Sequence, residues 1–241
     1  MKIVVFGAHP ADPVWWAGGT MAKHSKRGDK VIMVSLTCGE HSHADYFWEK
    51  ELKGEKIPGL DEIKKSKMKE FKEAVDTLKV EGIIMDYGDS PLKIGDERLK
   101  ELIDLIRKIK PDIVLTSWHT DPQNIDHATA GKIVWQACHH ARELGLKTQH
   151  PPHKVKYIYY YPPVMGFGQE VGFIPDTYID ISDTIDIKIE ALSKFWTQKI
   201  TKEFAEAWVK EHARIFAERV ESNYVEAFKR LWSQPLAYLP Y

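Results

Sequence analysis

The chain has 241 residues, of which 43% are hydrophobic and 29% are charged, and its formal net charge is −1. This length and composition are typical of a globular protein that buries one sizeable core. The near-neutral charge argues against nucleic acid or an anionic membrane as a partner. No apolar run reaches the roughly 18 residues that a membrane span needs. A predicted strand starts at the second residue, and Cys38 and Cys138 match no disulfide pattern, so we expect a protein of the reducing cytoplasm.

Strand-like runs of β-branched residues alternate with helical patterns along most of the chain. The sequence predicts strands at 2–7, 30–36, 82–86, 112–116 and 155–161, and helices at 15–27, 61–79, 96–109 and 127–144. This alternation predicts βαβ units and therefore an α/β, Rossmann-like fold with a mainly parallel sheet flanked by helices. From 187 to 231 the pattern is helical throughout, so residues 1–195 are assigned to the α/β domain and 196–241 to its helical C-terminal extension.

Three loops that follow predicted strands are longer than the scaffold requires. They span residues 37–60, 117–126 and 162–176. Long ordered loops in a compact domain are usually functional. The first loop carries the aromatic residues 46–48 and the third is rich in glycine and proline, so we expect both to close over a small substrate. The aromatic helices of the C-terminal extension could supply the interface of a homo-oligomer.

Histidine and aspartate side chains follow two of the predicted strands. His9 and Asp12 come after the first strand, and His119, Asp121 and His127 come after the fourth. Ligands of parallel α/β sheets bind beyond the carboxyl ends of the strands, so these side chains could meet at one site. Two imidazoles and a carboxylate are a common protein ligand set for a catalytic zinc ion, with the fourth position left to water. The pattern therefore predicts a zinc site.

Asp12, Asp126 and His127 also have a structural interpretation. Asp12 could cap the helix that begins near Val14, and Asp126 with His127 could cap the helix at 127–144. A second role for Asp126 is to orient a ligand imidazole from behind. His119 could contact substrate or serve as an alternative ligand.

Four segments resemble the PIG-L/LmbE superfamily, whose members are zinc-dependent enzymes best known as de-N-acetylases of sugar-like substrates. The resemblance covers roughly residues 1–195. The matching segments are Ala8-His9-Pro10-Ala11-Asp12-Pro13, Gly18-Gly19-Thr20, Thr37-Cys38-Gly39-Glu40 and Asn124-Ile125-Asp126-His127. The resemblance implies that His9, Asp12 and His127 are the zinc ligands.

The chain differs from the family pattern at two positions. Ala11 stands where the family has the aspartate that acts as general base, and Asn124 stands where it has a histidine that stabilises the tetrahedral intermediate. An alanine methyl cannot accept a proton, whereas an amide can still donate a hydrogen bond. General acid–base help is worth about 10²–10⁴-fold in rate. Glu40, or less favourably His119, is expected to replace the missing base, with Asp126 supporting the site.

One subgroup of the superfamily, the 4-oxalomesaconate hydratases, is similar at the altered first motif. It is also similar at residues 88–92 and in the Asp-Pro-x-Asn-x-Asp-His pattern of residues 121–127. That subgroup has Glu-Pro-His after the strand at 155–161, where this chain has Pro162-Pro163-Val164.

Three functions follow from these patterns. The first is a zinc-dependent hydrolase of a carbon–nitrogen amide bond in a small polar or sugar-like substrate. The second is a hydratase that adds water to an unsaturated di- or tricarboxylic acid, and the third is a non-catalytic metal- or metabolite-binding protein. For a substrate, Asn124, Asp121 and His41 are the predicted contacts.

Overall fold

Five apolar, β-branched segments form the parallel part of a central sheet. In the computed structural model, which describes residues 1–164 and 169–232, this sheet has seven strands in the order β3-β2-β1-β4-β5-β7-β6. The pairs from β3 to β5 are all parallel. Their bounds are Lys2–Gly7 for β1, Lys30–Ser35 for β2, Glu81–Ile84 for β3, Ile113–Ser117 for β4 and Tyr157–Tyr161 for β5. The α/β fold with a mainly parallel sheet is confirmed.

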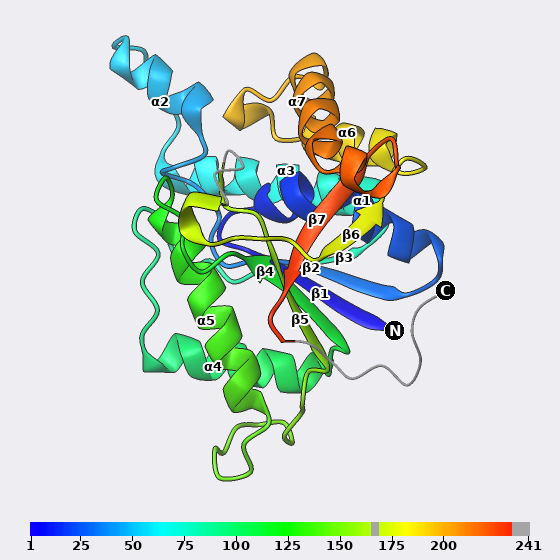
Figure 1. Cartoon of the computed structure of the whole chain (residues 1–241). Helices are drawn as coiled ribbons and strands as arrows, with labels where there is room; N and C mark the ends of the chain where they lie inside the picture. The colour runs from blue at the N-terminus through cyan, green and yellow to red at the C-terminus, as the bar shows by residue number, and fades with distance from the viewer. Residues whose placement is uncertain (165–168, 233–241) are drawn as a thin grey trace.

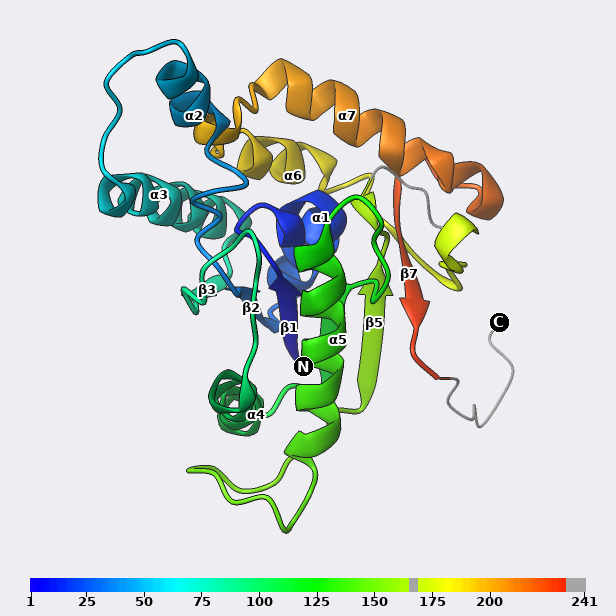
Figure 2. The ribbon, with the colours of Figure 1, turned by 90° about the vertical axis from the view of Figure 1, so that its left-hand side faces the viewer.

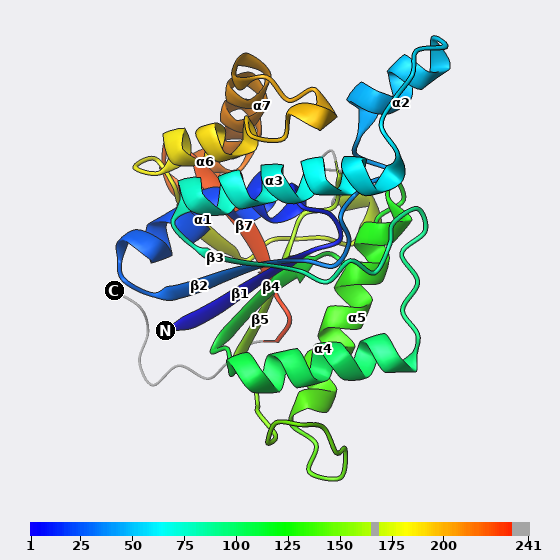
Figure 3. The same ribbon diagram turned by 180° about the vertical axis from the view of Figure 1, so that it is seen from behind.

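Helices cover both faces of the sheet (Figure 1). On one face lie α1 (Asp12–Lys26), α3 (Leu60–Leu78), α6 (Ile185–Leu192) and α7 (Lys202–Ile215), and on the other lie α4 (Asp96–Ile109) and α5 (Ile125–Ala141). The alternation of side chains along β1 explains the two layers, since Ile3 and Val5 belong to one buried cluster and Val4 and Phe6 to the other. Helix α2 (Asp45–Leu52), inside the predicted loop 37–60, projects from the body of the fold (Figure 3).

The order of the strands defines where a ligand can bind. The chain begins at β1 in the middle of the sheet, moves to β2 and β3 on one side, and then crosses to β4 and β5 on the other. The strand order therefore reverses between β1 and β4, and their carboxyl ends open a crevice at this switch point. Helix α5 packs on β4 and β1, and Figure 2 shows its first turn at the end of the sheet where α1 begins.

The prediction of helix throughout residues 187–231 is wrong for its last part. Residues Val225–Arg230 form β7, which pairs antiparallel with both β5 and β6 (Thr177–Asp180). Short 3₁₀ turns at Gln169–Val171, Trp196–Gln198 and Ala217–Val220 complete the described elements. The strand was missed because Glu226 points inward to pair with Lys188 at 2.7 Å, so the segment lacks the polar–apolar alternation of a strand. Pairing with β5 and β6 is a long-range effect that local periodicity does not contain.

Parts of two predicted segments fall outside the described residues. These are residues 165–168 of the predicted lid and residues 233–241 of the predicted extension. Among the described helices, none is both long and apolar enough to cross a membrane.

Gly131 allows α5 to pack directly on the end of β4. A Cβ atom at this position would overlap the carbonyl oxygen of Ser117 and lie 3.1 Å from the backbone nitrogen of His119. Both are backbone atoms that cannot move aside alone. We therefore expect Gly131→Ala to lower the free energy of unfolding by about 1–3 kcal/mol. Thermal unfolding would measure the loss, with Gly145→Ala as control because its Cβ meets nothing within 4 Å. Equal unfolding temperatures for the two variants would contradict the prediction.

Candidate metal centre

His9 and Asp12 occupy the turn between β1 and α1. His9 is fully buried, and its backbone N–H donates to Oδ2 of Asp12 at 2.7 Å. The same carboxylate oxygen lies 3.4 Å from Nδ1 of His9. Ala11 occupies the N-cap position and Asp12 is the first residue of α1, so the interpretation of Asp12 as the N-cap is wrong. A carboxylate in the first turn still interacts favourably with the helix dipole.

His127 reaches the same carboxylate from the other side of the crevice. Its Nε2 lies 3.3 Å from Oδ2 of Asp12. Asn124 is the N-cap of α5 and accepts hydrogen bonds from the backbone N–H groups of Asp126 and His127, so Asp126 is not the cap. The expected meeting of the two strand ends is thus present in the structure. Separations of 3.3–3.4 Å suit a tetrahedral zinc ion, whose ligands at about 2.0–2.1 Å lie about 3.4 Å apart.

His43, from the loop after β2, is a fourth member of this cluster. One ligand atom from each of His9, Asp12, His43 and His127 lies within 4.8 Å of the other three. The ring centroids of His9 and His43 are 4.3 Å apart. Sequence reasoning did not assign His43 to the metal. The available signal was its position after β2, the strand that pairs with β1.

The buried histidine nitrogens of the cluster fit a metal ion. Nδ1 and Nε2 of His9, Nε2 of His43 and Nε2 of His127 have no hydrogen-bond partner among the described residues. A buried polar atom without a partner costs about 1–3 kcal/mol. A divalent cation would satisfy the nitrogens that face Asp12, and two imidazoles with a carboxylate are a donor set that zinc prefers.

Two further carboxylates lie behind the histidines. Oδ2 of Asp121 is 3.3 Å from Nδ1 of His127 and accepts the backbone N–H of Val164 at 2.9 Å. Oδ2 of Asp126 is 3.4 Å from Nε2 of His9, and the Asp126 carboxylate also accepts the backbone N–H groups of Ser90 and Leu92. Such outer carboxylates fix the tautomer and orientation of metal-binding imidazoles. Asp126 therefore lies where sequence reasoning expected it, whereas Asp121, assigned to substrate, lies behind His127.

The electrostatics around His127 favour positive charge. Burial alone lowers the pKa of His127, but the carboxylates of Asp12 and Asp121 outweigh it and raise this pKa to about 10. Burial raises the pKa of Asp126, but its contacts with His9 and two backbone N–H groups lower it to about 2. The same negative potential that stabilises a proton here would attract a metal cation.

We expect Asp121→Asn to weaken zinc binding by about 10–100-fold, because the amide can no longer hold Nδ1–H of His127 with a full negative charge. Competition with a coloured chelator would measure the dissociation constant. Asp76→Asn is the control, since Asp76 is exposed and its ion-pair partner within the described part of the chain is Lys72 on α3. An Asp121→Asn protein that binds zinc as tightly as the control would contradict this role.

The other predicted site residues lie outside the four-residue cluster. Glu40 is buried, with Oε1 3.2 Å from Nζ of Lys64, while its Oε2 has no hydrogen-bond partner among the described residues. His41 is exposed and stacks on Trp48 with ring centroids 6.2 Å apart. His119 is half-buried against Trp118, and its Nδ1 contacts Thr120.

An open pocket of about 260 Å³ gives access to the cluster. It is lined by Asp12, Trp15, Trp16, His43, Gln123, Asn124, His127, Val164, Gln198 and Trp208. Three tryptophan rings and three amides thus surround the side chains that could hold a metal. The lining contains no lysine or arginine among the described residues.

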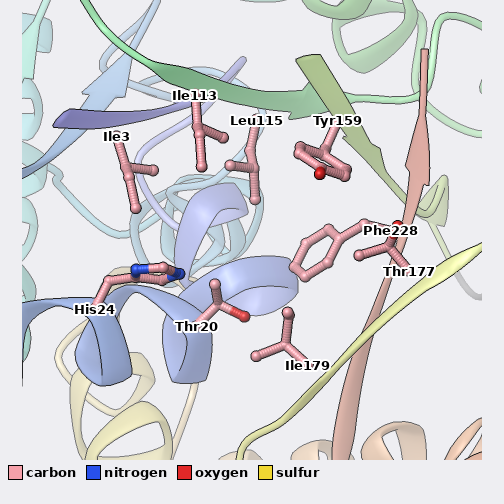
Figure 4. Close-up of a pocket in the computed structure, with 9 residues that line it drawn as sticks. All are labelled: Ile3, Thr20, His24, Ile113, Leu115, Tyr159, Thr177, Ile179 and Phe228. Carbon is pink, nitrogen blue, oxygen red and sulfur yellow. The ribbon is translucent and has the colours of Figure 1, made fainter. Parts of the chain in front are cut away.

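A second pocket, of about 100 Å³, lies between α1 and the sheet (Figure 4). Its walls are mainly apolar, with Ile3, Ile113 and Leu115 opposite Ile179 and Phe228. Its imidazole, His24, is paired with Asp29 at 2.8 Å. Among the described residues, this pocket brings together no set of metal ligands, whereas Asp12, His43 and His127 line the first pocket.

The fold and the site define a class: α/β proteins that carry a buried His/Asp cluster at the carboxyl edge of a parallel sheet. Known proteins are similar to this chain in sequence and in fold. The PIG-L family pattern, described as GlcNAc-PI de-N-acetylase, matches residues 4–138. A 4-oxalmesaconate hydratase of Pseudomonas putida is 32% identical over 193 residues, which cover 78% of this chain and 70% of that protein. A diacetylchitobiose deacetylase of Thermococcus kodakarensis is 28% identical, with 79% and 67% covered.

The chain belongs to the PIG-L family. Solved structures have the same fold. The 4-carboxy-2-hydroxymuconate hydratase of Pseudomonas putida superposes with a TM-score of 0.88 at 24% identity and covers 99% of both chains. The N,N'-diacetylchitobiose deacetylase of Pyrococcus horikoshii has a TM-score of 0.79 at 24% identity and covers 95% of this chain and 83% of its own. All of these relatives are named as enzymes: some are hydratases and the others are deacetylases.

Proposed function

We propose that this protein is a zinc-dependent enzyme that activates water, with His9, Asp12 and His127 as metal ligands. When bound, zinc lowers the pKa of a coordinated water to about 7 and polarises an oxygen of the substrate. Support comes from the 3.3–3.4 Å separations around Oδ2 of Asp12 and from the buried histidine nitrogens that lack partners among the described residues.

The reaction we propose is hydrolysis of an N-acyl amide in a small, uncharged, sugar-like substrate. The observation that carries this choice is the lining of the pocket over the cluster. Trp15, Trp16 and Trp208 offer flat apolar faces, and the amides of Gln123 and Gln198 offer hydrogen bonds to hydroxyl groups. A di- or trianionic acid would instead need cationic anchors, and residues 165–168 and 233–241 add no lysine or arginine to those described.

Glu40 and Asn124 supply the remaining groups in this proposal. Oε1 of Glu40 pairs with Lys64, and the buried Oε2 remains as an acceptor for a proton from water. Oδ1 of Asn124 is engaged in capping α5, so its amide NH₂ is the part that can donate to a substrate oxygen in the pocket.

The second candidate is hydration of an unsaturated di- or tricarboxylic acid. Ala11 favours it, because the alanine removes the base that an amidase of this family uses. The 32% identity with the 4-oxalmesaconate hydratase of Pseudomonas putida also supports it.

A substrate panel on the zinc-loaded protein distinguishes the two reactions. N-acetylated amino sugars would be followed by the appearance of a primary amine, and unsaturated dicarboxylic and tricarboxylic acids by loss of their ultraviolet absorbance. We expect amine release, and we expect the His127→Ala protein to be inactive. Turnover of the acids alone would replace the first proposal by the second. No turnover of either class by protein that contains zinc would favour a non-catalytic binding protein.

A further inference from the structure

A buried ion pair outside the pocket holds the loop that carries His43. Nζ of Lys67, on α3, lies 2.9 Å from Oε2 of Glu70, and both side chains are completely buried. The ammonium also donates to the backbone carbonyl of His43 at 2.8 Å and to Oγ1 of Thr197 at 3.0 Å. Glu70 in turn accepts the backbone N–H of Thr197 at 2.6 Å and its hydroxyl at 2.9 Å. Every member of this Lys67–Glu70–Thr197 network is therefore bonded, and both of its hydrogen bonds to the loop within the described residues reach the backbone carbonyl of His43.

A gain in the stability of the fold does not by itself explain why this ion pair is buried. Removing two charges from water costs several kcal/mol per ion, and hydrophobic replacements of similar volume are often neutral or stabilising. What the network does provide is a fixed position for the backbone of His43. The chain there is further held by the bond from the backbone N–H of His43 to the carbonyl of Gly39 at 3.1 Å.

The ring of His43 is placed toward the metal-binding side chains. Its Nε2 is buried and has no hydrogen-bond partner among the described residues. Its ligand atom lies within 4.8 Å of those of His9, Asp12 and His127, and it lines the pocket beside Asp12 and His127. A metal ion held by these three side chains would give this buried imidazole nitrogen a partner.

We propose that His43 is a fourth protein ligand of the metal, and that the Lys67–Glu70–Thr197 network is the device that positions it. This inference rests on the metal site of the proposed function. A third imidazole makes the donor set richer in nitrogen, which favours zinc or cobalt over magnesium. Zinc accepts a fifth ligand, so four protein ligands still leave room for a substrate or water on the pocket side.

The test replaces zinc by Co²⁺, whose visible absorption reports the number and type of ligands. In His43→Ala we expect a changed Co²⁺ spectrum and a rise in the zinc dissociation constant of about 100-fold, at the upper end of the loss caused by removing an outer partner. Added imidazole should fill the space left by the ring and restore the wild-type spectrum. The unfolding temperature of the metal-free variant serves to show that it is folded. A folded His43→Ala protein with the wild-type spectrum and zinc affinity would overturn the proposal.

The positioning role needs a different pair of variants. Lys67→Met should change the Co²⁺ spectrum and weaken zinc binding, although Lys67 does not itself belong to the metal cluster. Lys188→Met is the matched control, because Lys188 and Glu226 form another buried pair at 2.7 Å that bonds to the backbone of α1 rather than to His43. Equal spectral changes in the two variants would show a general loss of stability and would refute a positioning role.

Failure of this inference can be separated from failure of the proposed function. Wild-type protein that binds neither zinc nor Co²⁺ overturns both. Wild-type protein that binds metal and turns over substrate, beside a His43→Ala variant with unchanged spectrum and affinity, overturns the assignment of His43 alone.

Discussion

The His127→Ala protein is expected to contain no zinc after a purification that leaves about one zinc ion per wild-type chain. His127 supplies one of the two imidazoles that flank Asp12, and its Nε2 is 3.3 Å from the carboxylate between them. Without this imidazole the site loses its ligand from the β4 side of the crevice, and His9, Asp12 and the proposed ligand His43 remain. Elemental analysis of both proteins measures the effect.

His139→Ala is the matched control for this experiment. His139 lies on the same helix, α5, but is half-buried, outside the metal cluster, and forms a long ion pair with Glu143 at 3.9 Å. It should keep the zinc content of the wild type. Zinc retained in His127→Ala, or a wild-type protein that cannot be loaded with zinc, would refute the metal site and with it both enzymatic proposals.

The second large effect is expected for Glu40→Gln, which should lower turnover by about 10²–10⁴-fold while zinc content stays unchanged. The substitution keeps the shape of the side chain but removes its ability to accept a proton. Oε2 of Glu40 is buried without a partner among the described residues, whereas Oε1 pairs with Lys64. Steady-state kinetics on whichever substrate class is turned over, together with elemental analysis, would test the prediction.

Glu49→Gln is the comparison for this variant. Glu49 is exposed on α2 and pairs with Lys199 at 2.7 Å, away from the metal cluster. Its loss should leave turnover within about twofold of the wild type, as is usual for exposed ion pairs. Glu40→Gln with wild-type turnover would remove Glu40 from the mechanism and leave the role of the base to another group near the pocket.

Local sequence was enough to predict the first half of the site. His9 and Asp12 are three residues apart and follow a buried strand, so the turn alone brings the imidazole and the carboxylate together. His127 required one more inference, the rule that parallel strands present their carboxyl ends at one edge of the sheet. The caps were harder to predict. Asn124, rather than Asp126, is the N-cap of α5, and this leaves the carboxylate of Asp126 available to contact His9.

Two features could not be predicted from sequence because they depend on partners far along the chain. Strand β7 is stabilised by pairing with β5 and β6, and its buried Glu226 is compensated by Lys188, 38 residues away in the sequence. The position of His43 depends on Lys67, 24 residues later, and on Thr197, 154 residues later. No periodicity in a short window contains these contacts.

The sequence by itself therefore determined the α/β class, the parallel core of the sheet and a His/Asp pair at the end of its first strand. These features depend on local burial patterns and on short-range geometry, and a short stretch of consecutive residues contains both. Only the tertiary structure decided that His43 joins His9, Asp12 and His127, and that Asp121 lies behind His127. Such contacts arise when segments from different strand ends pack against one another, since buried polar groups must find their partners wherever the folded chain brings them.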